Sequence, residues 1–366
     1  MGYVAVKGGT NAIAQSIKRL KYNRIKKGEI LSINEIESGM RGLIDQVMSE
    51  SSIYCEELAA ISIKQAEGNP EEAVFLLRAY RSTLPRKHYS KVVRSEDMTV
   101  ERRISASFKD IPGGQILGAS YDYTHRLIDF DLADETKEEL IQWLENFNKE
   151  VDIIEDSTDI NKLPKVLDYL RSQGLISDCG EKNNEPKDIT KKSIEFPTER
   201  SERLQILTRG QTGAVTSLGY AALRGYGDTH PTIGELRVGS LPIYVDNPLN
   251  NDHDDEDSFY IGEIKVTEVE TLFPASEEKE DGKVQMELEI GYGICYGQNE
   301  TKAIAMSILD HCLEIGDPRY PTHDEEFVLL HIDSIESSGF ISHLKLPHYV
   351  TFKSKLDSIV KTRKGE

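Results

Sequence analysis

The stretch VQMELEIGYGICYGQNETKAIAMSILDHCLE (residues 284–314) decides the class of fold that the sequence predicts. Apolar and polar side chains alternate along 284–290, as they do in a strand with one buried face. The alternation ends at Gly291-Tyr292-Gly293, and apolar residues then recur at helical spacing over about 300–314. A strand, a glycine turn and a helix in this order indicate an α/β or α+β protein.

The N-terminal third is predicted to be largely helical after a short strand over 3–6. Ser32 and Glu35 form a capping box in front of apolar residues at helical spacing, which predicts a helix over 33–49. A second helix is predicted over 54–67. Asn69-Pro70 then supplies the N-cap and first-turn proline of a third helix, which ends before Pro85.

The rest of the chain is predicted to combine strands, helices and loops, with a strand-rich segment over 233–245. Helices are expected over 135–150, 162–173, 213–224 and 353–364. The rest of 131–202, the segment 246–283 and the acidic run Asp252–Asp257 are expected to be variable surface loops.

Together these patterns predict a helical N-terminal part followed by a mixed-sheet α/β body. We expect a helix-rich region over 1–85 and an α/β region with a glycine- and arginine-rich substrate loop over 86–176. A polar linker is expected over 177–200, followed by an α/β C-terminal domain over 201–366.

Composition limits the classes of protein and partner. The 366 residues suit two or three domains, and 44 Lys plus Arg against 63 Asp plus Glu give a net charge of −19. This charge opposes non-specific binding to nucleic acid, so a polyanionic ligand needs a local cationic pocket. Four cysteines without a CxxC pair, no signal peptide and no run of 18 apolar residues predict a cytoplasmic protein that does not enter a membrane.

The histidines are concentrated near the C-terminus, where five of nine lie within 311–348. The pair His343 and His348 has Pro347 between its members, which excludes a continuous helix and suits a turned loop. Two imidazoles in such a loop can bind one metal ion, with the remaining ligands supplied elsewhere. The alternative is that these histidines bond to backbone carbonyls in an ordinary fold.

A second group consists of cations around Pro112-Gly113-Gly114. Arginine side chains match phosphate oxygens in a bidentate way, and the N–H groups of Gly113 and Gly114 allow a phosphate to approach the backbone closely. The sequence thus suggests a polyphosphate pocket, although ion pairs with Asp110, Asp122 and Asp129 are an equal alternative. The candidate cations are Arg78, Arg81, Arg102, Arg103, Lys109 and Arg126.

The run 121–129 interleaves carboxylates and aromatic residues. If it is a strand, alternation places Asp122, Thr124 and Arg126 on one face, which suits a polar pocket. Several catalytic signatures are absent from the sequence, including GxxxxGK[ST], HExxH and GxSxG. A Walker-type ATPase, a zincin and an α/β-hydrolase are therefore disfavoured.

Four segments carry a resemblance to a known family. The chain resembles the PhnI family, a subunit of the bacterial carbon-phosphorus lyase system, and the similar segments are spread over 2–352. They are RAYRSTL (78–84), ERRISASFKDIPGGQILGASYDYTHRLIDF (101–130), RGYGDTHPTIGELRVG (224–239) and DEEFVLLHIDSIESSGFISHLKLPHYV (324–350).

The resemblance implies an enzyme subunit that displaces adenine from ATP by an alkylphosphonate such as methylphosphonate. The product would be a ribose 1-phosphonate 5-triphosphate, and the isolated subunit would be a nucleosidase that uses water instead. It also implies other carbon-phosphorus lyase subunits as partners, including the radical lyase subunit. In that family the histidine pair binds zinc near the lyase subunit, and here the pair is His343 and His348.

The residues in the matching segments suggest roles in this reaction. Asp122, Asp129 or Asp110 would stabilise positive charge on the ribose, and His125 or a nearby water would protonate the departing adenine. The six cations would hold the triphosphate, with Mg²⁺ as a candidate bridging ion. Two alternatives stay open at this point: a scaffold that lends histidine ligands to a shared metal site, and a zinc phosphoesterase.

Overall fold

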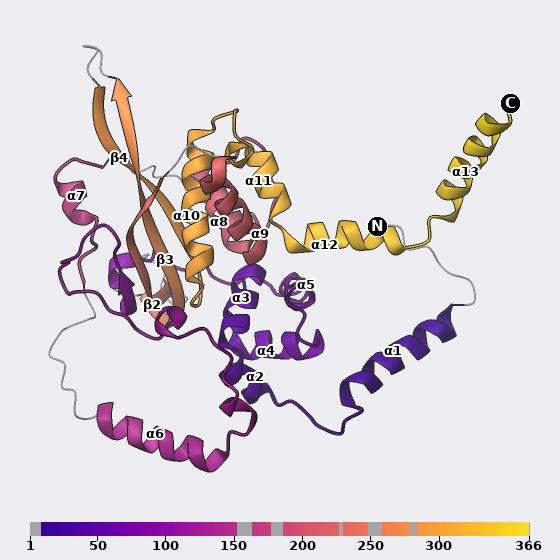
Figure 1. The fold of residues 1–366 in the computed structure, drawn as a ribbon, viewed down its shortest axis with the longest axis horizontal. Coiled ribbons are helices and arrows are strands. Elements are labelled where there is room, and N and C mark those ends of the chain that lie inside the picture. Colours follow the sequence, from indigo (N-terminus) through magenta and orange to yellow (C-terminus); the bar gives the residue numbers. More distant parts are fainter. Residues whose placement is uncertain are drawn as a thin grey trace. The chain divides into compact units, whose positions relative to one another are not determined.

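The computed structural model describes residues 9–151, 163–176, 186–226, 230–247, 258–278 and 284–365. The chain divides into two compact units, each assembled from separated segments. Figure 1 labels the helices and strands in chain order. Unit 1 comprises residues 1–86, 183–228 and 295–366, and unit 2 comprises residues 87–182 and 229–294. The predicted N-terminal region thus ends one residue before the first segment of unit 1 does, whereas the span 201–366 contributes to both units.

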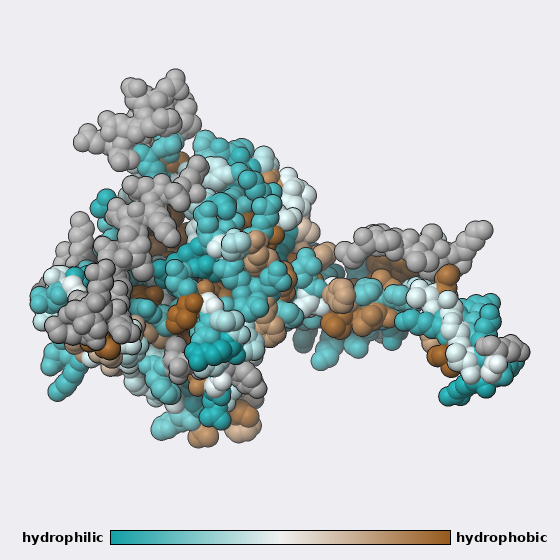
Figure 2. All heavy atoms as spheres, turned by 90° about the horizontal axis from the view of Figure 1, so that it is seen from above, coloured by the Kyte–Doolittle hydropathy of each residue, from teal (hydrophilic) through white to brown (hydrophobic). Residues whose placement is uncertain are grey.

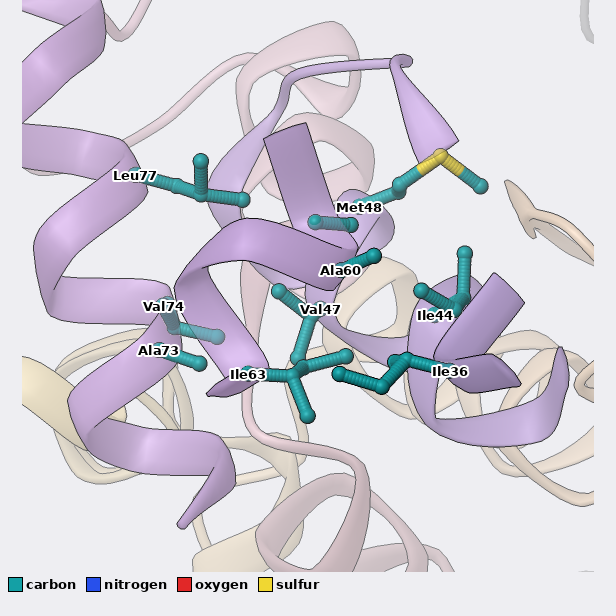
Figure 3. Packing of buried hydrophobic residues seen from close by; sticks show 10 residues of the cluster. Ile36, Ile44, Val47, Met48, Ala60, Ile63, Ala73, Val74 and Leu77 are labelled. Carbon is teal, nitrogen blue, oxygen red and sulfur yellow. The ribbon is translucent and has the colours of Figure 1, made fainter. Parts of the chain in front are cut away.

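The N-terminal helices of unit 1 pack around a common apolar core. Figure 3 shows Ile36, Val47, Ile63 and Val74, from four different helices, with their side chains directed at one another, and all four are buried. Burial of such side chains contributes about 1.5–3 kcal/mol each. The helices are α2 (Ile33–Gly39), α3 (Arg41–Ser51), α4 (Glu56–Gln65) and α5 (Pro70–Arg81).

The capping predictions for these helices are confirmed, but one boundary is wrong. Ser32 and Glu35 form the expected capping box, and the Asn69 side chain accepts the N–H of Glu72. The single helix predicted over 33–49 is two helices, because Met40 has the non-helical backbone angles φ −123° and ψ 37°. Gly39 directly before it has a low helix propensity, which favours a break there.

Helix α10 (Glu300–Ile315), which is the helix predicted over 300–314, is buried along most of its length. Helix α9 (Thr212–Ala221) packs closely on α10, because a Cβ atom added at Gly219 would lie 2.9 Å from the Cβ of Ala305. The remaining helices of this unit are α1 (Thr10–Ile25), α8 (Arg200–Arg209), α11 (Glu325–His331), α12 (Ser334–Ser342) and α13 (Tyr349–Lys364).

Unit 2 contains a four-stranded sheet with the order β1-β2-β3-β4. Its strands are β1 (Thr99–Ile104), β2 (Thr232–Asp246), β3 (Ser258–Glu278) and β4 (Val284–Tyr296). The pairs β1/β2 and β2/β3 are antiparallel. The predicted mixture of helices and strands is confirmed, and the antiparallel pairing selects α+β over α/β. Helices α6 (Lys137–Val151) and α7 (Asp168–Ser172) also belong to this unit.

Four predictions about local structure in unit 2 are wrong. The helix predicted over 162–173 is only the short α7 at Asp168–Ser172, and Gly291-Tyr292-Gly293 lies inside β4 instead of ending it. Strand β3 occupies most of the segment 246–283, where the sequence suggested a loop. Its polar residues lie on a buried, charged sheet face and so look like loop residues in the sequence. The strand predicted over 121–129 is instead a 3₁₀ turn at Tyr121–Tyr123 followed by irregular backbone, with Arg126 at φ 55°. The Ser120 hydroxyl accepts the N–H of Asp122 and starts this turn.

Some predictions lie outside the described residues: the strand over 3–6, the first part of the polar linker (177–185) and the acidic run Asp252–Asp257. Among the helices that the structure does describe, none combines the length and apolar character that crossing a membrane requires.

One face of the sheet carries a buried set of charged side chains, which we call the sheet network. Glu235 accepts from Arg103 Nε at 2.6 Å, and Glu268 is bound by Arg237 and, at 3.0 Å, by Lys165. The β2/β3 register places Arg237 opposite Glu268. The network consists of Arg103, Lys165, Glu235, Arg237, Glu268 and Glu270, and all six residues are buried.

The sheet network predicts acid sensitivity in unit 2. Burial alone would raise the pKa of Glu268, but Arg237 and Lys165 outweigh burial and lower this pKa from its ordinary value of 4.5 to about 2. A lowered carboxyl pKa stabilises the fold above the unfolded-state value and loses that stabilisation as the pH falls through the folded-state value. We therefore expect about 3 kcal/mol of stability to be lost between pH 5 and pH 2.

Urea unfolding at a series of pH values measures this effect. In Glu268→Gln the free energy of unfolding should fall less between pH 5 and pH 2 than it does in the wild type. Identical slopes of stability against pH for both proteins would contradict the assignment.

Candidate functional site

The predicted substrate-binding residues fall into both units. Arg78 and Arg81 belong to unit 1, whereas the candidates between Arg102 and Asp129 belong to unit 2. Each group is therefore described by itself.

In unit 2 the structure joins Asp122 to two of the predicted cations. Arg102 Nη2 lies 2.5 Å from Asp122 Oδ2, and Arg126 Nη2 lies 3.8 Å from Asp122 Oδ1. Arg102 also donates to the carbonyl of Leu117. Arg102 is buried, while Asp122 and Arg126 are exposed. Arg102 therefore forms the ion pair that the sequence offered as the alternative to phosphate binding. Its partner, Asp122, remains about half exposed.

Arg103 is fully buried, and each of its three nitrogens donates a hydrogen bond within the protein. Nε donates to Glu235, Nη1 to the carbonyl of Pro112 at 2.5 Å, and Nη2 to the carbonyl of Pro164 at 2.6 Å. Gly113, at φ 81°, allows the loop to close here, since a Cβ atom would lie 2.4 Å from Leu163 Cδ2. Arg103 and Gly113 thus hold the loop around Pro112-Gly113-Gly114 against the sheet.

The remaining candidates of unit 2 are exposed side chains. Lys109, Asp110, His125 and Asp129 all face solvent, and Asp129 accepts the N–H of Asp131 at 3.1 Å. Gly114 donates its N–H to the carbonyl of Ile111 at 2.9 Å, so this N–H is occupied.

In unit 1, four arginines meet at the ends of two helices, and we call them the arginine cluster: Arg78, Arg81, Arg86 and Arg209. Arg78 has a structural role in it. Its Nε donates to the carbonyl of Glu50 at 2.9 Å, its Nη2 to the carbonyl of Arg209 at 2.9 Å, and its Nη1 to Asp333 at 2.6 Å. Arg78 thus joins the C-terminal ends of α3 and α8 to the N-cap of α12.

The other members of the arginine cluster differ in their partners. Arg86 pairs with Asp188 at 2.9 Å. The side chains of Arg81 and Arg209 have no hydrogen bond or ion pair with any residue in the described part of the chain. Four guanidinium groups beside the carboxylates of Asp188 and Asp333 leave a local charge of +2.

Burial and neighbouring positive charges both lower pKa values in the arginine cluster. Burial, together with the neighbouring charges of Arg78 and Arg81, lowers the pKa of Arg209 to about 10. Burial and the charge of Arg86 also lower the pKa of Arg81. Arginine is protonated at neutral pH, so the guanidinium groups of the cluster repel one another, and a bound anion would relieve this electrostatic cost.

Sequence reasoning missed Arg209. It lies in an ordinary helical segment, RSERLQILTRG, and arginine is common in the last turn of helices because it complements the helix dipole. Its proximity to Arg78 arises only from tertiary packing, in which α8 lies against α3 and the Arg209 carbonyl accepts from Arg78, so the local sequence contains no indication of the cluster.

The histidine pair of unit 1 has a geometry that suits a metal ion. The ring centres of His343 and His348 are 5.6 Å apart. Two imidazoles bound to one tetrahedral zinc ion through nitrogens at about 2.0–2.1 Å have ring centres roughly 5 Å apart. The Nδ1 atoms lie against backbone carbonyls, of Phe340 for His343 and of Leu346 for His348. This leaves each Nε2 available, an arrangement typical of metal-binding histidines.

Two ligands do not complete a metal shell. No group of three or more His, Cys, Asp or Glu suited to a metal ion occurs within the described ranges of the chain. His343 is half-buried and His348 is exposed, so further ligands can approach from outside this chain.

A surface hollow of about 700 Å³ lies elsewhere in unit 1, near His323. Arg319, Asp324, Glu325 and Glu326 are among the residues that line it. Arg319 already pairs with Asp317, so the hollow carries negative charge. It is therefore unsuited to a polyphosphate.

Several helices expose apolar faces. All residues of α1 and α13 are exposed, including Ile13, Ile17 and Leu20 at helical spacing on α1. Figure 2 shows exposed apolar side chains in brown on the helical segment that contains α12, where Phe340 and Ile341 are exposed. Exposed apolar surfaces of this kind commonly mark contacts with other proteins.

Comparisons with known proteins agree over almost the entire chain. The family model for PhnI, described as a bacterial phosphonate metabolism protein, matches residues 2–366. The putative C-P lyase subunit protein HtxH of Stutzerimonas stutzeri is 42% identical, over 99% of this chain and 96% of the relative. The α-D-ribose 1-methylphosphonate 5-triphosphate synthase subunit PhnI is 38% identical in Rhizobium meliloti (99% of this chain, 95% of the relative). The protein of the same name in Escherichia coli is 40% identical (97% of this chain, 96% of the relative).

Proposed function

The chain belongs to the PhnI family of bacterial phosphonate metabolism proteins, and on this premise we propose that it is a catalytic subunit of a ribose 1-methylphosphonate 5-triphosphate synthase. The proposed reaction displaces adenine from ATP by an alkylphosphonate. The observation that carries the proposal is that two relatives named as subunits of that synthase align with nearly the whole chain.

The proposed chemistry exchanges one bond of the ribose for another. A phosphonate oxygen bonds to ribose C1 as the bond to adenine N9 breaks, and adenine leaves with the electron pair and takes up a proton. The 5-triphosphate is unchanged. The transition state places positive charge on the ribose, which a carboxylate can stabilise. When the chain acts alone, water replaces the phosphonate.

We assign the ribose-stabilising role first to Asp122, with Asp110 and Asp129 as the other candidates. Arg102 and Arg126 contact Asp122, so its carboxylate is held in place while half of its side chain remains exposed. His125, three residues on and exposed, is the proposed proton donor to adenine. Lys109 and Arg126 are the proposed phosphate-binding cations in unit 2, whereas Arg102 acts through Asp122, and Mg²⁺ is a proposed counter-ion of the triphosphate.

We also propose that His343 and His348 bind zinc through Nε2. The support is the separation of their rings and the bonding of both Nδ1 atoms to carbonyls. Zinc bound there would supply positive charge and open coordination positions. The proposed partners, other carbon-phosphorus lyase subunits including the radical lyase subunit, would complete its shell and cover the exposed apolar helices. A cytoplasmic location belongs to the same proposal.

The zinc proposal predicts a loss of metal on substitution of either histidine. We expect His343→Ala and His348→Ala to reduce the zinc content of the complex by at least about tenfold, since each removes half of the ligands from this chain. Elemental analysis of the purified complex measures it. His331→Ala is the matched control, because His331 at the end of α11 also bonds a backbone carbonyl through Nδ1. Equal zinc content in all four proteins would contradict the site.

Incubation with ATP tests the enzyme proposal against its alternatives. A nucleosidase releases adenine, a zinc phosphoesterase releases phosphate from an intact nucleoside, and a scaffold releases neither. We expect adenine from the wild-type chain and a loss of about a hundredfold or more in Asp122→Asn, because the stabilising negative charge is removed. Phosphate without adenine, or no product even with companion subunits, would contradict the proposal.

A further inference from the structure

Two guanidinium groups in unit 1 form no hydrogen bond or ion pair with any described residue: those of Arg81 and Arg209. Both side chains are partly buried, and they are electrostatic neighbours of each other and of Arg78. Cations that lose solvent without gaining a partner destabilise a fold, and such arrangements are concentrated at sites that bind a ligand of opposite charge.

Arg78 fixes the positions from which these two side chains extend. Arg78 and Arg81 are three residues apart in the last turn of α5, and they therefore lie on neighbouring positions of one helix face. Arg209 is the residue whose carbonyl accepts from Arg78 Nη2 at 2.9 Å. Arg81 and Arg209 thus both neighbour Arg78, whose own guanidinium nitrogens are all bonded within the protein.

We infer that Arg81 and Arg209 form an anion-binding site that holds a polyphosphate, with Arg78 as the positioning residue between them. The local charge of +2 matches a ligand with at least two negative charges, and each guanidinium can bond two oxygens of a phosphate group. The anion site rests on the geometry of unit 1 alone and is independent of the residues proposed in unit 2.

A purely structural explanation for these arginines is weaker. Arginine in the last turn of a helix interacts with the terminal carbonyls, and that explanation fits Arg78, which bonds the carbonyls of Glu50 and Arg209. Arg81 and Arg209 bond no carbonyl among the residues that the structure covers. Because Arg78 already occupies the carbonyl oxygens, the helix ends repel an approaching anion less.

Calorimetric titration of the full chain with inorganic tripolyphosphate tests the inference without any reaction. We expect Arg81→Gln and Arg209→Gln to weaken binding by about ten- to a hundredfold each, as the loss of charged hydrogen bonds does. Arg209→Lys should weaken binding less, since lysine keeps the positive charge but lacks the two-pronged hydrogen-bonding geometry of the guanidinium group. The matched control is Arg319→Gln, which removes an exposed arginine beside the acidic hollow and should change the affinity by less than about twofold.

Three results would overturn the inference. The first is no tripolyphosphate binding by the wild type, either alone or in the assembled complex. The second is unchanged affinity in both Gln variants. The third is orthophosphate binding as tight as tripolyphosphate binding, which would mark a site for a single phosphate. A thermal melt of each ligand-free variant verifies folding, and Arg209→Gln should melt no lower than the wild type because it removes an unpaired charge.

The same variants separate this inference from the proposed function. If adenine is released but tripolyphosphate affinity is insensitive to Arg81 and Arg209, the anion site is wrong and the enzyme proposal stands. If tripolyphosphate binding depends on both residues but no adenine is ever released, the anion site stands and the enzyme proposal fails.

Discussion

Replacement of Glu235 by alanine is expected to lower the free energy of unfolding of unit 2 by about 3–5 kcal/mol. The Glu235 carboxylate accepts from Arg103 Nε at 2.6 Å and from the N–H of Val166 at 3.0 Å. Arg103 is 0% exposed and Glu235 2% exposed, so the substitution leaves a buried guanidinium without its counter-ion. This loss of stability comes mainly from leaving the buried Arg103 charge uncompensated, and it is larger than the net contribution of the ion pair itself.

Hydrogen exchange of the amides in β1, β2 and β3 measures this loss, because these amides exchange through opening of the sheet. We expect their exchange to become faster by about a hundredfold or more. Glu101→Ala is the control, since Glu101 on β1 pairs with Lys265 at the surface and should cost less than about 1 kcal/mol. Similar effects of the two substitutions would show that the sheet network does not stabilise unit 2.

The second large effect is expected for Arg78→Ala, which should destabilise unit 1 by about 2–4 kcal/mol. The substitution removes three hydrogen bonds at once and leaves the carboxylate of Asp333 and the carbonyls of Glu50 and Arg209 without their donor. Burial tends to raise the pKa of Asp333, but the charge of Arg78 contributes to a net lowering of this pKa. The loss of stability in Arg78→Ala should therefore be measurable at neutral pH.

Urea unfolding of Arg78→Ala, Asp333→Ala and the double variant measures the coupling between the two residues. The double variant should lose less stability than the sum of the two single variants, because each single substitution leaves the other residue without its ion-pair partner. Arg81→Ala, one turn later on α5, is the matched control and should change stability by less than about 1 kcal/mol. Additive losses, or an equal loss in the control, would contradict the structural role of Arg78.

These assignments also show which parts of the fold are visible in a sequence. The capping box at Ser32 and Glu35 and the Asn69-Pro70 start of α5 are local, and the structure confirms them. The alternation over 284–290 and the helix after it are local as well. Each depends on neighbours within a few residues, so tertiary packing does not change the interpretation.

Strand β3 was missed because its polarity has a tertiary cause. Glu268 and Glu270 resemble surface residues until β2 places Arg237 beside Glu268 and a separate segment places Lys165 beside both. Charged residues are buried in this way only when paired, and the pairing partners are far apart in the sequence. The number of charged residues in 246–283 therefore predicted a loop incorrectly.

The sequence predicted the segments that contain the candidate site residues, but it did not predict which of the cations lie together. The pairing of His343 with His348 follows from their spacing around Pro347, and the structure brings the two rings together. The six predicted cations, by contrast, have different surroundings: Arg78 and Arg103 are fully bonded within the protein, whereas Arg81 has no partner among the described residues. Arg209 joins Arg81 only through helix packing.

The most direct test of the account is a product analysis. The chain, assembled with its companion subunits, is incubated with ATP and methylphosphonate, and the products are identified by mass spectrometry and ³¹P NMR. We predict equal amounts of free adenine and a ribose that carries methylphosphonate at C1 and an intact triphosphate at C5. Unchanged methylphosphonate together with ADP or free phosphate as the product of ATP would contradict the account.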